Sequence, residues 1–301
     1  MEQRTAAVVV TYNRIDLLQR CMDALLAQTT PCTVLLVDNA STDGTGEWAA
    51  ALAKENDRVL YRNTGSNLGG AGGFNMGMRW ALEEDFDFIW LMDDDTLPQA
   101  DALQKLLEAD ARLQGNYGWL SGVALWTDGR ECKMNRQKVR KDFYEYSECL
   151  EQGILRAEQA TFVSLFLRKE AALQAGLPIR EFFIWGDDIE YTRRISVRLG
   201  RPCFVAGQSR VVHAMAQNTG SSIAIDDAGR ISRYNYAFRN ENYLYRKEGL
   251  RGFCYYFAKC GINFLRVWGK AKDHRLHRSW IIVKNLFGGL FFNPKTEYVK
   301  K

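Results

Sequence analysis

The sequence lacks several features that would place it in a common class of protein. No stretch approaches the roughly 20 apolar residues needed to span a bilayer, and residues 1–12 show neither the basic region nor the apolar core of a secretory signal. The seven cysteines are scattered, odd in number and without a Cys-x-x-Cys pair. We therefore expect reduced thiols in a cytoplasmic protein, with neither a disulfide framework nor a zinc site.

The glycine-rich stretch at residues 63–75 matches neither of two common nucleotide-binding loops. After residues 70–72 (Gly-Ala-Gly), the third glycine of a dinucleotide-binding fingerprint would fall on Asn75, and no Gly-Lys-Ser/Thr follows as in a P-loop. A Rossmann dehydrogenase and a P-loop NTPase are therefore not supported. The five glycines within residues 65–73 would still let backbone N–H groups approach a diphosphate or a sugar. A flexible turn is the alternative interpretation.

Charge is distributed unevenly along the chain. Residues 251–301 carry 11 lysines and arginines against two acidic residues, whereas the first 250 residues carry 29 basic and 34 acidic residues. The basic segment is also rich in aromatic residues, and this combination favours association with an anionic lipid surface. A helical subdomain whose aromatic residues pack on the main core is the alternative. Nucleic acid is not expected as a partner, because no DNA- or RNA-reading motif accompanies the basic segment.

The most informative stretch spans residues 86–98. Its apolar run at residues 88–92 is typical of a buried strand and ends at three consecutive aspartates. On a strand, Asp93 and Asp95 would face one way and Asp94 the other. Two carboxylates on one side repel each other unless a proton or cation lies between them, and such ligands suit Mg²⁺ or Mn²⁺. An acidic, solvated turn is the alternative.

Strand-like and helix-like segments alternate, which predicts an α/β protein with a mostly parallel sheet. In such sheets ligands bind beyond the carboxyl ends of strands, and three polar clusters follow expected strands. Pro98 is expected in the first turn of a helix, and residues 126–159 in a loop-rich insertion. The expected strands are 6–11, 34–37, 59–62, 88–92, 117–125, 161–167 and 209–212, and the expected helices end near residues 28, 55, 84, 115 and 200.

A second acidic cluster follows an aromatic run at residues 182–186. Asp187–Glu190 would occupy the first turn of a helix, where the helix dipole alone favours acidic residues. Phe183 and Trp185 would add an apolar wall on which a sugar ring can stack. His213 closes a strand-like run, and a lone histidine is more often structural than a metal ligand.

Five motifs, taken in order, resemble the family 2 glycosyltransferases with a GT-A fold. The galactofuranosyl- and rhamnosyltransferase-like branch, which carries the Gly-Gly-Ala-Gly-Gly stretch, is the most similar. The resemblance covers roughly residues 5–215. The motifs are VVVTYNR at 8–14, VDNASTDGT at 37–45, NLGGAGGF at 67–74, DDD at 93–95 and WGDDIE at 185–190.

The resemblance implies a Rossmann-like, mostly parallel central sheet flanked by helices. A glycosyltransferase domain would occupy residues 1–230, with a nucleotide-binding half at about 1–115 and an acceptor half at about 116–230. Residues 231–301 would form a helical, basic and aromatic extension that packs on the domain or associates with a membrane.

The resemblance also implies roles for single residues on the donor side. Asp93, Asp95 and His213 match the metal-ligand positions of the family, so that a divalent cation, Mn²⁺ or Mg²⁺, would bind there. Asp38 would bond the uracil or thymine ring. The residues implied to lie beside the nucleotide sugar are Thr11, Tyr12, Arg14, Asp38, Asn67, Gly69, Gly70 and Asp94.

On the acceptor side, Asp188 matches the general base of the family. Asp187 and Glu190 would orient hydroxyl groups of acceptor or donor, and Trp185 and Phe183 would bind the acceptor. A sugar hydroxyl is a poor nucleophile and needs a carboxylate to take its proton, while a divalent cation neutralises the departing diphosphate. One base opposite the leaving group gives inversion. A retaining double displacement needs a second carboxylate, and the sequence leaves Asp187 open for that role.

The implied function is an inverting, metal-dependent glycosyltransferase. It would move a sugar, galactofuranose or rhamnose by the resemblance, from a UDP- or dTDP-sugar to a glycan or polyprenyl-diphosphate-linked acceptor. The product would be a bacterial surface polysaccharide such as O-antigen, capsule or cell wall. The protein would work in the cytoplasm at the inner face of the plasma membrane, held through residues 251–301. The sequence leaves a homo-oligomer open.

Two other functions compete with this one. A catalytically silent nucleotide-sugar binding module could serve an assembly complex, although both acidic clusters are retained in full. A nucleotidyltransferase would also place acidic residues on metals at the edge of a Rossmann-like sheet. It would be expected to carry a basic, glycine-rich triphosphate loop near its N-terminus, which residues 8–14 lack.

Overall fold

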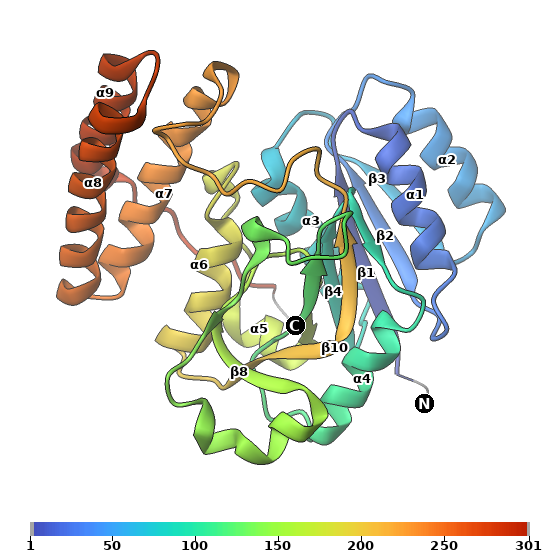
Figure 1. Cartoon of the computed structure of the whole chain (residues 1–301). Coiled ribbons are helices and arrows are strands. Elements are labelled where there is room, and N and C mark those ends of the chain that lie inside the picture. Colours follow the sequence, from blue (N-terminus) through green and yellow to red (C-terminus); the bar gives the residue numbers. More distant parts are fainter. Residues whose placement is uncertain (1–2, 300–301) are drawn as a thin grey trace.

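The computed structural model describes residues 3–299 and shows one mixed sheet in the middle of the molecule, with helices on both faces (Figure 1). The strand order is β3-β2-β1-β4-β9-β6-β10-β8-β7, and β5 pairs with β10 beside this path. The expected α/β class is confirmed. The strands are β1 (Thr5–Thr11), β2 (Thr33–Asp38), β3 (Val59–Asn63), β4 (Phe88–Asp93), β5 (Thr96–Pro98), β6 (Leu120–Leu125), β7 (Lys138–Val139), β8 (Ile154–Gln159), β9 (Leu165–Arg168) and β10 (Cys203–His213). The α-helices are α1 (Ile15–Leu26), α2 (Thr45–Glu55), α3 (Gly69–Glu83), α4 (Ala102–Arg112), α5 (Lys169–Ala175), α6 (Asp187–Arg193), α7 (Tyr234–Lys247), α8 (Leu250–Lys270) and α9 (Arg275–Gly288).

The first half of the sheet is parallel and deeply buried. β1 pairs in parallel with β2 and with β4, and β2 pairs in parallel with β3. All seven residues of β1 are buried, as expected for a run of Ala and Val covered by helices on both faces. Because these strands run the same way, the polar residues that follow β1, β2 and β4 lie at one edge of the sheet.

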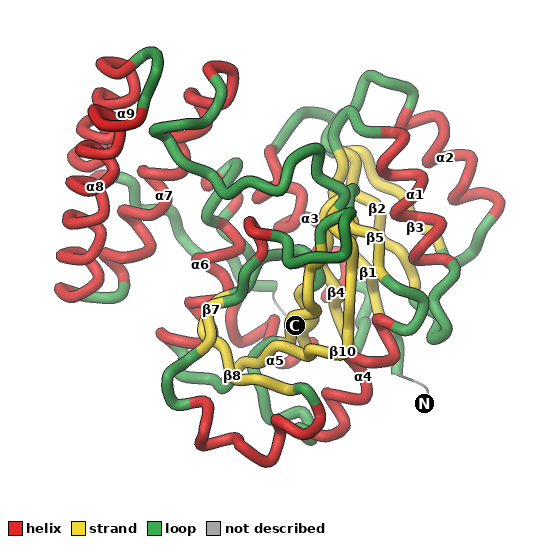
Figure 2. Tube along the Cα trace, in the orientation of Figure 1, coloured by secondary structure: helices red, strands yellow, loops and turns green. Residues whose placement is uncertain are grey.

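The second half of the sheet is mixed. β9 runs antiparallel to both β4 and β6, while β10 is parallel to β6 and antiparallel to β8. The parallel arrangement is therefore correct for β3-β2-β1-β4 and for the β6–β10 pair. Within residues 126–159, expected to be mainly loop, β7 and β8 form a short hairpin that extends the sheet at its far end (Figure 2).

The glycine-rich stretch is helical from Gly69 onward, so the interpretation as a loop or flexible turn holds only for residues 64–68. α3 begins at Gly69, five residues before the expected start at residue 74. The physical reason is close packing on the sheet, because a Cβ added at Gly73 would lie only 2.4 Å from Val10 Cγ1. Glycine lets the backbone of α3 approach β1 where any side chain would collide.

β4 does not lead directly into a helix, so the expectation for Pro98 is also wrong. The chain forms the short strand β5, which ends at Pro98, and α4 begins only at Ala102. Thr96 of β5 pairs in antiparallel register with His213 of β10. This pairing carries a histidine from far along the chain to the end of β4.

Three helices form a separate layer at the C-terminal end, as expected for the helical extension. α7, α8 and α9 pack around an apolar cluster that includes Phe238, Tyr256 and Ile281. They lie beside α6, away from β1 and β2 (Figure 1). Within residues 3–299, no helix combines the length and apolar character needed to cross a bilayer.

Candidate functional site

The end of β4 forms the centre of the candidate site. Asp94 accepts a hydrogen bond from Thr11 Oγ1 at 2.8 Å. Arg14 Nη1 lies 3.2 Å from Asp94 Oδ1 and 2.9 Å from Asp95 Oδ2. Thr11 ends β1 and Arg14 follows it, and β1 is the parallel neighbour of β4, so the sheet itself brings these groups together.

His213 completes a group of three potential metal ligands. One ligand atom from each of Asp93, Asp95 and His213 lies within 4.8 Å of the others. Two carboxylates and one imidazole suit Mn²⁺ and leave coordination positions for phosphate oxygens. The three residues that the resemblance implied as ligands are thus close together.

A fourth residue, Asn135, orients the imidazole. Its Oδ1 lies 2.7 Å from Nδ1 of His213, and its Nδ2 donates a hydrogen bond to Thr161 Oγ1 at 2.9 Å. Because an amide oxygen only accepts, Nδ1 donates and Nε2 is the atom that faces the aspartates. Nε2 lies 2.9 Å from Asp95 Oδ1, yet within residues 3–299 no donor reaches this buried oxygen with hydrogen-bond geometry. This buried, unsatisfied oxygen beside an imidazole nitrogen fits a cation site.

The electrostatics of the cluster agree with this fit. Burial raises the pKa of Asp93 to about 7, and the charge of Asp95 adds to the increase. Burial lowers the pKa of His213, but the adjacent carboxylate of Asp95 outweighs burial and raises it to about 10. Burial likewise raises the pKa of Asp94 to about 6, against the effect of Arg14. Crowded carboxylates of this kind hold a proton or a cation.

Asp38 lies at the end of β2 and is fully buried. Its Oδ2 accepts hydrogen bonds from Tyr61 Oη at 3.0 Å and Asn63 Nδ2 at 3.1 Å, and its Oδ1 accepts one from the backbone N–H of Ser41 at 2.9 Å. These contacts fix the carboxylate at the sheet edge beside the groups that follow β1.

The other residues implied for the donor lie around the start of α3 and the end of β1. Tyr12 has 43% of its side chain exposed and is free to contact a ligand. Asn67 Oδ1 accepts a hydrogen bond from the backbone N–H of Gly69 at 2.8 Å. A Cβ at Gly69 would lie 2.1 Å from the carbonyl oxygen of Phe183, whereas a Cβ at Gly70 would meet open space. The start of α3 and the loop before α6 therefore touch at Gly69.

Asp187 and Asp188 begin α6. Asp188 Oδ1 accepts a hydrogen bond from the backbone N–H of Ile189 at 2.7 Å, and burial raises the pKa of Asp188 to about 6. Burial also raises the pKa of Asp187 well above its ordinary value, and the charges of Asp188 and Asp93 add to this increase. The loop that leads into this cluster packs on the start of α3, where the backbone N–H of Ala71 donates to the carbonyl of Phe183 at 3.2 Å.

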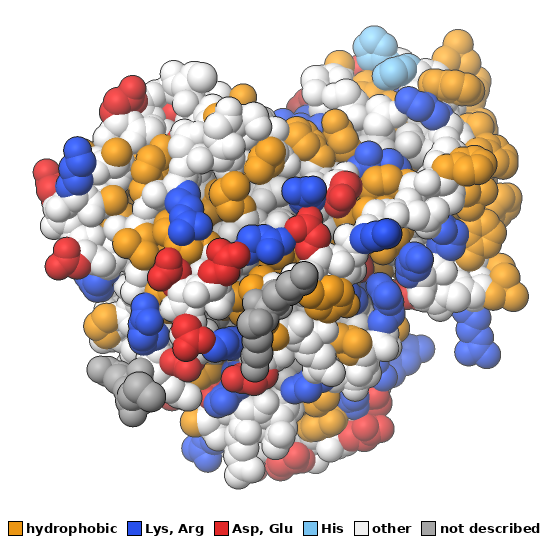
Figure 3. Space-filling view, turned by 180° about the vertical axis from the view of Figure 1, so that it is seen from behind, with side chains coloured by type: hydrophobic (Ala, Val, Ile, Leu, Met, Phe, Trp, Pro, Cys, Tyr) orange, Lys and Arg blue, Asp and Glu red, His pale blue; other side chains and the backbone are white. Residues whose placement is uncertain are grey.

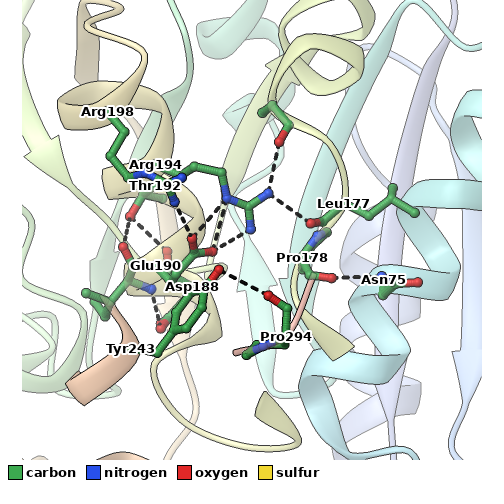
Figure 4. A network of polar contacts seen from close by, with 12 residues as sticks. Asn75, Leu177, Pro178, Asp188, Glu190, Thr192, Arg194, Arg198, Tyr243 and Pro294 are labelled. Carbon is green, nitrogen blue, oxygen red and sulfur yellow. Dashed lines mark hydrogen bonds and ion pairs between the residues drawn. The ribbon is translucent and has the colours of Figure 1, made fainter. Parts of the chain in front are cut away.

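Glu190, expected to orient substrate hydroxyls, lies in an internal ion pair. Its side chain is 1% exposed, its Oε1 accepts a hydrogen bond from Arg194 Nε at 3.0 Å, and Arg198 Nη1 lies 3.4 Å away (Figure 4). Arg194 also donates to the carbonyls of Ala175 and Leu177, at 2.9 and 3.0 Å. The carboxylate is therefore engaged in an internal ion pair that ties α6 to the segment before it.

Phe183 and Trp185, expected to form an apolar wall, pack against a second layer of aromatic rings. Phe183 stacks on Tyr236 with ring centroids 5.1 Å apart, and Trp185 meets the edge of Tyr234 at 5.0 Å. Both partners come from α7, so the C-terminal helices contribute to the acceptor side.

Sequence reasoning missed Asn135 and the contribution of α7. Asn135 lies in a charged segment without periodicity, and no motif marks it. The Tyr-Asn-Tyr run at residues 234–236 was a usable indication of an aromatic surface.

Comparisons with known proteins agree with this geometry. The family described as Glycosyl transferase family 2 matches residues 6–119. The galactofuranosyltransferase GlfT1 of Mycobacterium tuberculosis (strain H37Rv) is 30% identical over 265 residues, which cover 83% of this chain and 85% of that protein. The undecaprenyl-phosphate mannosyltransferase of Micrococcus luteus is 41% identical over 108 residues, covering 35% of this chain and 44% of that protein.

Two solved structures share the fold. The structure of GalNAc-T7 with UDP, GalNAc and Mn²⁺ superposes with a TM-score of 0.64 at 12% identity, over 94% of this chain and 55% of that one. The structure of S. aureus TarS superposes with a TM-score of 0.53 at 14% identity, over 94% of this chain and 43% of that one. The chain thus spans about half the length of these two proteins, and the likeness concerns the fold alone.

Proposed function

Because the chain belongs to glycosyltransferase family 2 and is a sugar-transferring enzyme, we propose that it is a metal-dependent, inverting transferase that uses a UDP- or dTDP-sugar. The observation that carries this proposal is the meeting of two acidic clusters. Asp93 and Asp95 lie with His213 on one side. On the other side, Asp187 and Asp188 follow the loop whose Phe183 carbonyl accepts a hydrogen bond from Ala71 of α3, and the charge of Asp93 adds to the raised pKa of Asp187. Such a pair of clusters can hold a diphosphate through a cation and accept a proton beside it.

On the donor side, the nucleotide diphosphate would bind at the edge where β1, β2 and β4 end. Asp93, Asp95 and His213 would hold Mn²⁺ or Mg²⁺, which neutralises charge on the departing diphosphate when it is bound. Arg14 would add a fixed positive charge close to the same place. Asp38 would contact the base.

On the acceptor side, Asp188 would take the proton of the attacking hydroxyl. The acceptor oxygen forms a bond to the anomeric carbon as the bond from that carbon to the diphosphate oxygen breaks, and the electron pair leaves with the nucleoside diphosphate. A single displacement of this kind inverts the anomeric centre. Asp187 is the candidate nucleophile for the alternative double displacement, which would retain configuration.

The choice of sugar and acceptor rests on the relatives. The similarity to a galactofuranosyltransferase over most of both chains supports galactofuranose first, with rhamnose as the second candidate. The partial similarity to an undecaprenyl-phosphate mannosyltransferase supports a polyprenyl-linked acceptor in surface polysaccharide synthesis. A few contacts in the pocket decide such discrimination.

A panel of nucleotide sugars tests this function. With Mn²⁺ present, UDP-galactofuranose or dTDP-rhamnose should raise the melting temperature more than the free nucleotides do, since ligands that bind the folded state stabilise it. The preferred donor should then give a product with inverted configuration in the presence of a polyprenyl-diphosphate-linked glycan. Binding without hydrolysis or transfer, with every acceptor offered, would instead identify the silent binding module.

We also propose that the protein docks on the inner face of the plasma membrane through α8 and α9. Their outer side carries large apolar side chains that are largely exposed, and Lys and Arg lie beside them (Figure 3). Between residues 249 and 296 the only acidic residue is Asp273. An apolar, aromatic and basic face of this kind fits an anionic lipid surface. Its most exposed members are Leu250, Phe257, Ile262, Leu265, Trp268, Leu276, Trp280, Phe287 and Phe291.

Vesicle flotation of the full chain tests this docking. Replacing Phe257, Leu265 and Trp268 together with serine should reduce flotation with phosphatidylglycerol vesicles, and added salt should weaken the binding of the unchanged protein. Serine at Tyr144 and Ile225, which are 71% and 66% exposed outside the helices, is the matched control. Unchanged flotation of the triple variant would exclude the lipid surface. A dimer that the triple variant dissociates would show that this face binds a second copy instead.

A further inference from the structure

The loop that precedes the second acidic cluster has an unusual backbone. We call residues 182–186 the acceptor loop. Within it, Phe183 (φ 62°, ψ −62°) and Trp185 (φ 63°) adopt positive φ values that side chains of this size avoid. Such conformations persist only where the surrounding structure holds them, and they cluster at functional sites.

One side chain, Asn240 of α7, makes three polar contacts with this loop. Asn240 is fully buried, and its Nδ2 lies 3.0, 3.3 and 2.8 Å from the carbonyl oxygens of Phe182, Ile184 and Trp185. Its two amide hydrogens are therefore shared among three carbonyls of one short loop. A buried amide with this many backbone acceptors fixes the path of the chain.

A neighbouring arginine sets the orientation of that amide. Arg239 donates to Asn240 Oδ1 from Nε at 3.1 Å and from Nη2 at 3.0 Å, and its Nη2 also donates to the carbonyl of Glu181 at 2.7 Å. With Oδ1 held by the guanidinium, the amide nitrogen must face the loop.

The opposite side of the loop rests on the donor half. The backbone N–H of Ala71 donates to the carbonyl of Phe183 at 3.2 Å, and only glycine fits at position 69 against the same carbonyl. The acceptor loop is therefore clamped between the start of α3 and Asn240. It continues directly into Asp187 and Asp188.

We propose that Asn240 is a positioning residue for the acceptor: it holds the loop so that Phe183, Trp185 and the carboxylates of α6 present one surface to the incoming sugar. This inference rests on the proposed transferase function. It gives the C-terminal helices a role in the reaction, because the helix that packs against the membrane-docking pair also fixes the acceptor loop. Asn240 itself touches no reacting atom.

The chain offers a matched control two residues away. Asn242 is also fully buried on α7, and its Nδ2 donates to the carbonyls of Asn285 and Leu286 in α9, at 3.3 and 2.9 Å. Replacement of either asparagine by aspartate keeps the shape and removes the amide hydrogens. Asn240→Asp disturbs the acceptor loop, whereas Asn242→Asp disturbs only the packing between α7 and α9.

The test compares both variants by kinetics and by amide hydrogen exchange. Asn240→Asp should lower kcat/KM for the acceptor by about 10- to 100-fold, the range expected when a bound group is misplaced by about 1 Å, and leave the affinity for the nucleotide sugar unchanged. Asn242→Asp should lower the melting temperature and leave the acceptor kinetics of the folded enzyme unchanged. Equal kinetic losses in both variants, or a loss of donor affinity in step with acceptor use, would make Asn240 merely structural.

Hydrogen exchange separates this inference from the proposed function. In the absence of any substrate, Asn240→Asp should speed exchange in the peptide that contains residues 182–188, and Asn242→Asp should leave that peptide protected. An unchanged loop in Asn240→Asp would overturn the inference even if the enzyme transfers sugar. A loosened loop in a protein that transfers no sugar would instead reject the transferase and keep Asn240 as the residue that fixes the loop.

Discussion

The two acidic clusters have a similar composition but different surroundings. At the end of β4, Asp94 and Asp95 face Arg14, and Asp95 also faces His213. At the start of α6, no cationic side chain within residues 3–299 pairs with Asp187 or Asp188. The carboxylates of the first cluster lie beside positively charged groups. Those of the second cluster have no such partner, which suits a group that accepts a proton.

The same contrast recurs within α6 itself. Asp188 and Glu190 are two residues apart, yet Glu190 is neutralised by Arg194 in the protein interior, while Asp188 accepts a single backbone hydrogen bond. Two acidic residues that are neighbours in sequence therefore lie in different electrostatic surroundings.

The largest effect is expected at Asp188. Asp188→Asn keeps the shape and the hydrogen bond from Ile189 but cannot take a proton, so transfer should fall by about 10²–10⁴-fold, the usual contribution of a general base. Donor affinity, measured by calorimetry, should stay the same. Folding should be as strong as before or stronger, because burial disfavours the ionised carboxylate that the variant removes. Transfer within tenfold of the unchanged enzyme would assign the base elsewhere.

Glu190→Gln should lower the stability of the protein and leave transfer nearly unchanged, the reverse of Asp188→Asn. Removing the carboxylate leaves the buried guanidinium of Arg194 without its counter-charge, which typically costs about 3–5 kcal/mol of unfolding free energy. Denaturant titration measures that loss, and transfer per folded molecule should remain close to normal. If Glu190→Gln instead folds stably and loses transfer, Glu190 belongs with Asp188 on the acceptor side.

These contrasts also show what the sequence could and could not predict. The parallel half of the sheet and the polar residues at its edge follow from apolar runs that end in Asp or Asn, so Thr11, Arg14 and Asp93 were placed correctly together. The spacing of Glu190 and Arg194, four residues apart on a helix, was an available indication of an ion pair. The early start of α3 depends on how closely its glycines approach β1, and no local pattern encodes that distance.

Residues that act through long-range contacts were harder to predict. Asn135 meets His213 across 78 positions of sequence and Asn240 meets Phe182 across 58. Asn135 reaches His213 because β6 pairs with β10 and the chain then folds back along β6, and Asn240 reaches Phe182 from α7. The resemblance pointed to His213 but supplied no reason for its position.

Asn135→Ala tests whether the first cluster depends on the orientation of His213. Without the acceptor at Nδ1, the imidazole of His213 loses its fixed orientation, and such changes typically weaken metal affinity by about 10- to 100-fold. Titration with Mn²⁺ followed by electron paramagnetic resonance measures this without any turnover. Asn63→Ala, at a residue that contacts Asp38 and not the three ligands, is the control. Equal Mn²⁺ affinity in both variants would show that Asn135 does not orient the ligand.

The smallest expected effect is a dependence of transfer rate and stability on pH through Asp188 of the second cluster. An aspartate normally has a pKa near 3.8, but burial raises the pKa of Asp188 to about 6, so at saturating donor and Mn²⁺ the transfer rate should fall about tenfold for each pH unit below 6. The free energy of unfolding should change in the opposite direction and rise as the pH falls from 6 to 4. In that range the folded protein binds a proton at Asp188 that the unfolded chain does not bind. The stability advantage of Asp188→Asn over the unchanged protein should therefore be largest above pH 6 and shrink as the pH falls towards 4. If the stability difference between Asp188→Asn and the unchanged protein does not vary with pH, Asp188 has an ordinary pKa. The two clusters would then not differ in their electrostatics.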